Sequence, residues 1–223
     1  MKIDIISVQP KMFEGFLGES IVARAIRKGA CDIRILDLRD FAHDRHRKVD
    51  DRPYGGGPGM LMTCAPWFEA VESTEPAGAR VIMTSPAGRR FDQRAAEELS
   101  REERLVFMCG HYEGFDARIE TLATDMFSIG DFVMTGGELA AAAMVDSIVR
   151  LLPGVLGGGP AAVRNESFGR DGLLEAPQYT HPPEFRGMEV PAVLRGGDHA
   201  KIEAWKRAEA RKLTARLRPD LEQ

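Results

Sequence analysis

The stretch LVFMCGHYEG, residues 105–114, joins a continuous apolar run to a glycine-rich turn. An apolar run that ends at a glycine is typical of a buried strand. Similar runs occupy residues 3–8 and 81–84, and both end shortly before a proline. Residues 33–38 alternate apolar and charged side chains, which predicts a strand with one solvated face. A further apolar segment, residues 129–134, ends just before a pair of glycines.

Helical periodicity lies between these runs. Apolar residues recur at helical spacing over residues 12–28, and Gly29 stands where a helix C-cap belongs. Helices are also predicted over residues 66–71, 94–99 and 139–152. Because strands alternate with helices, we expect an α/β fold with a mainly parallel sheet and helices on both faces. Ligands of such sheets bind beyond the carboxyl ends of the strands.

Three glycine-rich segments indicate a built site at that edge. They are residues 110–114, residues 130–138 and HDRHRKVDDRPYGGGPGMLM, residues 43–62. The last of these places basic and imidazole groups beside backbone that other groups can approach closely. The chain has no Gly-x-Gly-x-x-Gly after its first strand and no Gly-Lys-Ser/Thr loop, so dinucleotide binding and P-loop hydrolysis fit poorly.

The composition is that of a globular protein with a sizeable core. Of 223 residues, 43% are apolar and 29% are charged, and the net charge of −4 argues against nonspecific coating of nucleic acid. No apolar run reaches the roughly 18 residues of a membrane span. The first ten residues carry no signal-peptide pattern. Three scattered cysteines indicate reduced packing residues rather than disulfides or zinc ligands, so we expect a cytoplasmic protein without a membrane partner.

The composition changes after Pro153. We divide the chain into an α/β domain of residues 1–156, a linker of residues 157–170 and a small helical domain of residues 171–223. The linker is rich in glycine, alanine and proline, so we expect residues 157–166 to be mobile without a bound partner. A terminal helix is predicted after Asp198, a suitable N-cap. Its basic side chains suit phosphate contacts or a solvated helix face: Lys201, Lys206, Arg207, Arg211, Lys212, Arg216 and Arg218.

Six segments, taken in order, resemble the TrmD family of bacterial tRNA (guanine-N1)-methyltransferases in the SPOUT superfamily. They are DRHRKVDDRPYGGGPGMLM (44–62), TSPAGRRFDQ (84–93), CGHYEGFDARI (109–119), SIGDFVMTGGELAA (128–141), DSIVRLLPGVLG (146–157) and GMEVPAVLRGGDHAKIEAWK (187–206). The resemblance implies a deep trefoil knot, S-adenosylmethionine as methyl donor, and a homodimer with active sites at the subunit interface. The implied substrate is tRNA with a guanosine at position 37, 3′ of the anticodon, preceded by another guanosine.

The resemblance also implies a donor pocket built largely of backbone groups. The residues at the matching positions are Ser85, Pro86, Gly110, Tyr112, Glu113, Gly114, Ile129, Gly130, Asp131, Phe132, Val133, Met134, Gly136, Gly137 and Leu139. Glu113 and Asp131 are both candidates to offset the positive charge of the donor. His111 departs from the arginine that is most often expected before Tyr-Glu-Gly.

Methylation of guanine N1 needs a base for the N1 proton and a cation near O6, where negative charge develops. Arg150 matches the catalytic arginine of the family, and its planar fork suits O6. Glu166 stands where the family most familiarly has an aspartate before Ser-Phe, so its side chain is one methylene longer. We predict Glu166 as the base, with Asp171 and Asp50 as rivals.

Residues 43–62 are expected near the dimer interface and the tRNA. Arg45, His46 and Lys48 are candidates for phosphate contacts, and Asp50 is a candidate for orienting catalytic groups. Arg164 is a weaker candidate for holding the anticodon loop. We expect no structural metal, because the His43–His46 pair has no cysteine or third histidine nearby. An assisting Mg²⁺ ion is left open.

Two other functions stay open on the sequence. The first is a SPOUT-type methyltransferase that acts on ribosomal RNA. An assay with a tRNA transcript whose target guanosine is changed would distinguish it from a tRNA methyltransferase. The second is a non-catalytic RNA-binding protein that has kept the fold. That reading predicts RNA affinity without methyl transfer, and the presence of both Arg150 and Glu166 argues against it.

Overall fold

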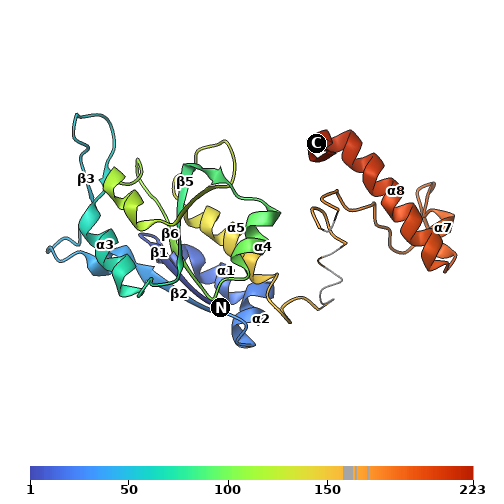
Figure 1. The fold of residues 1–223 in the computed structure, drawn as a ribbon, viewed down its shortest axis with the longest axis horizontal. Helices are drawn as coiled ribbons and strands as arrows, with labels where there is room; N and C mark the ends of the chain where they lie inside the picture. Colours follow the sequence, from blue (N-terminus) through green and yellow to red (C-terminus); the bar gives the residue numbers. More distant parts are fainter. Residues whose placement is uncertain (158–162, 164, 170, 223) are drawn as a thin grey trace. The chain divides into compact units, whose positions relative to one another are not determined.

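The computed structural model describes residues 1–157, 163, 165–169 and 171–222. The chain forms two compact units, Met1–Gly157 and Gly158–Gln223 (Figure 1). The predicted linker of residues 157–170, with its expected mobility, lies largely outside the described residues.

A five-stranded parallel sheet forms the centre of the first unit, in the order β2-β1-β6-β5-β7. The strands are β1 (Lys2–Ser7), β2 (Asp32–Asp37), β5 (Arg80–Arg90), β6 (Arg104–Met108) and β7 (Asp125–Ser128). The predicted strands at residues 3–8, 33–38, 81–84 and 105–109 are confirmed within a residue or two, although β5 continues further to Arg90 through an irregular stretch after Thr84.

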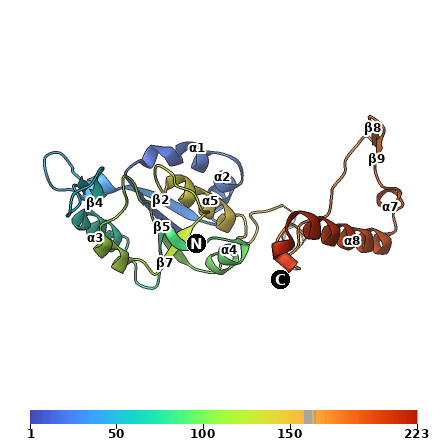
Figure 2. The same ribbon diagram turned by 90° about the horizontal axis from the view of Figure 1, so that it is seen from above.

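Helices cover both faces of the sheet, as predicted. They are α1 (Glu14–Gly18), α2 (Ser20–Arg27), α3 (Cys64–Ser73), α4 (Gln93–Leu99) and α5 (Glu138–Val149). Leu105 and Phe107 of β6 face a core that contains residues of α2, α4 and α5, whereas Val106 and Met108 face a second core with α3. Figure 1 shows α3 on one side of the sheet and α4 and α5 on the other, and Figure 2 gives the view from above. The fold class is therefore confirmed, while the trefoil knot stays a prediction.

Two sequence predictions about this unit are wrong. Residues 12–28 do not form one helix, because Glu19 is extended and Ser20 has a φ of 56°, which separates α1 from α2. The apolar segment 129–134 is a loop, and the strand lies just before it as β7. The Ser128 hydroxyl accepts from the Gly130 amide (3.2 Å) and donates to the Gly130 carbonyl (2.9 Å), which satisfies this backbone locally and ends the strand.

The second unit is built around one long helix. Its elements are a hairpin of β8 (Glu184–Phe185) and β9 (Met188–Glu189), α7 (Ala192–Arg195), α8 (His199–Leu217) and η4 (Pro219–Glu222). The predicted N-cap is confirmed, since Asp198 accepts from the Lys201 amide at 3.2 Å. The buried Thr214 hydroxyl of α8 accepts from the Leu174 amide (3.0 Å), which fastens the segment before the hairpin to the helix.

The three cysteines are free thiols. Cys31 and Cys109 are buried, and burial raises the pKa of the Cys109 thiol well above its usual value. None of the helices that the structure describes combines the length and apolar character needed to cross a membrane.

Candidate functional site

A cavity of about 330 Å³ lies at the carboxyl edge of the sheet, where β6 and β7 end and β5 becomes irregular after Thr84. Its walls come from residues 83–86, from residues 110–115 and from the loop between β7 and α5. Every residue that the sequence assigned to a donor pocket lines this cavity except Asp131 and Leu139, which are exposed beside it. The structure thus brings the predicted residues together, and their role in binding stays a prediction.

The two glycine loops of the cavity are held against each other by backbone contacts. The Gly137 amide donates to the Gly110 carbonyl at 2.7 Å, and His111 forms a bridge with Gly136. The buried Thr84 hydroxyl lies beneath them, donating to the Met108 carbonyl (3.1 Å) and accepting from the Gly110 amide (3.3 Å). The backbones of the two loops therefore lie too close together to leave room for a side chain at Gly137.

Gly137 shows how close this approach is. A Cβ atom placed there would lie 1.9 Å from Thr84 Oγ1 and 3.0 Å from the Gly110 amide nitrogen. Since φ is an ordinary −85°, the requirement for glycine comes from space and not from backbone conformation.

Backbone bonds also fasten the 43–62 segment to the cavity. The Glu113 amide donates to the Met60 carbonyl (3.0 Å), and the Met62 amide donates to the Gly114 carbonyl (2.9 Å). Asp50 pairs with Met62 in the short hairpin of β3 (Asp50–Asp51) and β4 (Leu61–Met62). This segment and the loop at 110–114 therefore form one framework.

The Glu113 side chain packs against the backbone of the 43–62 segment at Gly59. A Cβ atom at Gly59 would lie 2.3 Å from Glu113 Cγ. The absence of a side chain at Gly59 thus gives the Glu113 side chain its place beside the cavity that it lines.

A turn at Asp44 presents the candidate phosphate-binding residues to solvent. Asp44 accepts the amides of His46 and Lys48, both at 2.8 Å, and these bonds lower the pKa of the Asp44 carboxyl. Arg45, His46 and Lys48 are exposed. Lys48 forms an ion pair with Asp51 at 3.1 Å. Arg164, the other candidate RNA contact, lies outside the described residues.

The two predicted catalytic residues belong to different units. Arg150 follows the last residue of α5 in the first unit and is half-buried. Glu166 belongs to the second unit, where it lines a cavity of about 1090 Å³ together with Asp171 and with Lys206 and Arg207 of α8. Glu166 shares this cavity with its rival Asp171, whereas its other rival, Asp50, belongs to the first unit. The choice of the base among these three acids stays a prediction.

The family model of tRNA (Guanine-1)-methyltransferase TrmD matches residues 1–223. The chain belongs to the TrmD family. It is 55% identical to the tRNA (guanine-N(1)-)-methyltransferase of Geobacter sulfurreducens, over 99% of this chain and 91% of that protein. It is 53% identical to the proteins of the same name from Limosilactobacillus fermentum and Geobacillus kaustophilus, over 99% of this chain and 89% and 91% of theirs.

Several residues that line the cavity were not among those that the sequence assigned to a donor pocket. Thr84, His111, Phe115, Glu120 and Ser128 also line the cavity. Thr84 ends the apolar part of β5, and Ser128 ends β7. Each stands directly before a segment with proline or glycine, and that position in the sequence was a usable signal.

A buried acid beside the cavity was missed as well. Glu138 opens α5 directly after two glycines and is 1% exposed. In the sequence, Glu138 is only the last residue of the glycine-rich segment 130–138, directly before the predicted helix of residues 139–152.

Proposed function

We propose that this TrmD-family chain transfers a methyl group from S-adenosylmethionine to N1 of the guanosine at position 37 of tRNA, when another guanosine precedes it. The observation that carries the proposal is the cavity at the carboxyl edge of the sheet, formed by the glycine loops of a chain that belongs to this family over its whole length.

The residues of the cavity fit S-adenosylmethionine. A volume of about 330 Å³ lies within the range of roughly 300–1,000 Å³ of small-molecule sites. Backbone groups of the glycine loops suit the polar edges of an adenine ring, and Phe132 and Met134 offer apolar contact. Glu113 and Glu120 line the cavity, and their carboxylates would offset the positive charge of the donor. When bound, the donor supplies an electrophilic methyl group on a sulfonium sulfur.

The protein's own task is then to orient guanine and to accept a proton. Neutral guanine carries a proton on N1, which has to leave as the N1–carbon bond forms and the sulfur–carbon bond breaks. We assign the Glu166 carboxylate as the acceptor of this proton. We assign the Arg150 guanidinium as the donor to O6, where it stabilises the developing negative charge.

The second unit is proposed to hold the tRNA, together with the exposed turn at residues 44–48. Helix α8 presents Lys206, Arg207 and Arg211 to the cavity of this unit, and such side chains suit backbone phosphates. Because tRNA is the substrate, we place the enzyme in the cytoplasm.

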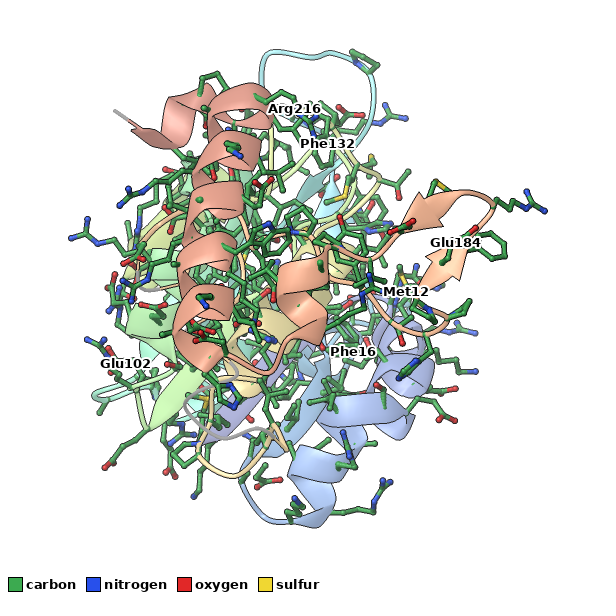
Figure 3. All side chains as sticks on the ribbon, turned by 90° about the vertical axis from the view of Figure 1, so that its right-hand side faces the viewer. Met12, Phe16, Glu102, Phe132, Glu184 and Arg216 are labelled. Atoms are coloured by element: carbon green, nitrogen blue, oxygen red, sulfur yellow. The ribbon has the colours of Figure 1, made fainter. Side chains whose placement is uncertain are left out.

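We further propose that the enzyme is a knotted homodimer. Phe132 and Val133, which line the cavity, and Leu139, which follows them in the chain, are 55%, 87% and 60% exposed. Figure 3 labels Phe132. Apolar side chains gathered in this way indicate a protein interface. Light scattering is expected to give twice the mass of the chain, and a monomer at micromolar concentration would contradict the dimer.

Methyl transfer from labelled S-adenosylmethionine tests the proposed function. The substrates are a tRNA transcript with guanosines at positions 36 and 37, the same transcript with adenosine at 37, and a ribosomal RNA fragment. Label in the first alone is expected. Label in ribosomal RNA would favour the alternative substrate, and RNA binding without any transfer would favour the non-catalytic reading. Parallel reactions with EDTA test the requirement for Mg²⁺.

A further inference from the structure

Glu138 is a carboxylate that the proposed reaction does not use, although it lies beside the cavity. At 1% exposure, it needs hydrogen bonds to offset its desolvation. One oxygen has such a bond, because the Ser7 hydroxyl at the end of β1 donates to Oε1 at 2.8 Å. The same Ser7 oxygen accepts from the Gln9 amide at 2.8 Å, which fixes the direction of its hydrogen.

The other oxygen of Glu138 faces His111. Nδ1 of His111 lies 3.7 Å from Glu138 Oε2, too far for a hydrogen bond. That ring nitrogen is buried and has no hydrogen-bond partner among the residues that the structure describes. A movement of about 0.8 Å would bring the two atoms to the usual distance of about 2.9 Å.

This pair lies between the two loops that form the cavity. A Cβ atom at Gly136 would be 2.3 Å from Glu138 Oε2 and 2.5 Å from His111 Nδ1. His111 belongs to the loop at 110–114 and lines the cavity, whereas Glu138 and Gly136 belong to the segment that closes it from the other side. A bond between His111 and Glu138 would therefore tie the loops together.

We propose that Glu138 is a positioning residue for the methyl donor and acts through His111. When the donor binds, the His111 ring moves toward Glu138, and its Nδ1–H donates to Glu138 Oε2. This bond fixes the tautomer of the ring and leaves Nε2 as an acceptor for an N–H or O–H group of the donor. The inference rests on the proposed function, because it assigns this role in the donor pocket.

A double-mutant cycle on the full chain tests the coupling, with calorimetry of S-adenosylmethionine binding and steady-state kinetics. Glu138→Gln keeps the shape of the side chain and removes its charge. We expect this variant to raise Kd and KM for the donor about tenfold, the effect of one hydrogen bond to a charged group. We expect kcat and the KM for tRNA to stay within about twofold of wild type, because the pair acts on the donor alone.

The half-buried His111 provides the second variant. We expect His111→Ala to weaken donor binding similarly, and the double variant to be no weaker than His111→Ala alone. Glu72→Gln, which removes the same charge from an exposed position of α3, is the matched control and should bind the donor as wild type does. Losses that multiply in the double variant, or an unchanged donor Kd in folded Glu138→Gln, would overturn the proposal.

Nitrogen-15 spectra of the histidine rings give a readout that does not depend on how stable the variants are. With the wild-type chain and S-adenosylmethionine, the His111 ring, assigned by its loss in His111→Ala, should carry its proton on Nδ1. A proton on Nε2 alone would overturn the proposal. A wild-type chain that binds no S-adenosylmethionine would refute the proposed function itself. Donor binding by the wild type that is unchanged in Glu138→Gln would refute only the role of Glu138.

Discussion

Replacing Gly137 with alanine should damage both the stability of the first unit and its affinity for the methyl donor. The new Cβ atom would lie 1.9 Å from Thr84 Oγ1 and 3.0 Å from the Gly110 amide nitrogen. Real Cβ atoms essentially never approach closer than 3.0 Å, so either the Thr84 side chain or the loop has to move by about 1 Å or more.

The size of the effect follows from what that movement breaks. Thr84 is 6% exposed, and its hydroxyl serves the Met108 carbonyl and the Gly110 amide. Losing one such bond in a buried place costs about 1–3 kcal/mol, and overpacking a core costs about 1–3 kcal/mol. The two costs do not add in full, because a shift of Thr84 that breaks its hydrogen bond also relieves the overpacking. We therefore expect the free energy of unfolding to fall by about 2–4 kcal/mol and the affinity for the donor to fall at least about tenfold.

Denaturant unfolding and donor calorimetry measure the two effects. Adding Thr84→Ala removes the oxygen that clashes, so the double variant should be more stable than Gly137→Ala alone. Gly15→Ala is the control, since a Cβ atom there meets nothing within 4 Å and alanine suits helix α1. A Gly137→Ala variant with the stability and the donor affinity of the wild type would contradict this prediction, because it would show that the loops have room for a Cβ atom.

Three further variants test other parts of the structure. Glu166→Gln should reduce methyl transfer to under about a tenth while donor affinity stays unchanged, because only the proton acceptor is lost; greater residual activity would move the base elsewhere. Arg80→Ala should cost about 2 kcal/mol at neutral pH, because Arg80 binds both oxygens of Asp125 (2.7 and 2.6 Å). Hydrogen bonding from Arg80 lowers the pKa of the Asp125 carboxyl, so this stabilisation is present above the usual pKa near 3.9 and is lost as the pH falls through the folded value. Unfolding curves of variant and wild type should thus converge in acid, and a constant difference would contradict the assignment. Arg45→Ala should weaken tRNA binding equally for all sequences and reduce the slope of log affinity against log salt by about one, and an unchanged slope in filter binding would exclude a phosphate contact.

The parallel sheet could be predicted because its signals are local. Buried strands such as β6 read as continuous apolar runs, and the helix that ends before Gly29 carries its own periodicity and cap. The break at Glu19 and the end of β7 at Ser128 were missed. Both depend on single backbone conformations, and at Ser128 two hydrogen bonds of one hydroxyl outweigh the apolar pattern that follows.

The candidate site was predictable to the extent that glycine loops follow neighbouring parallel strands. Their gathering at one edge is a consequence of topology. The contacts beneath the loops were not predictable, because Ser7 and Glu138 are 131 residues apart in sequence and meet only through the fold. The prediction that Arg150 and Glu166 are both catalytic comes from the family resemblance. No pattern in the sequence links the end of a helix to a residue in the other unit.

The identity of the methylated atom is the sharpest test of the proposed function. A tRNA transcript with guanosines at positions 36 and 37 is treated with the full chain and S-adenosylmethionine, then digested and measured by mass spectrometry against nucleoside standards. We expect 1-methylguanosine, mapped to position 37 and missing when that base is adenosine. Methylation of another atom or another position, or an unmodified tRNA in the presence of bound donor, would contradict it.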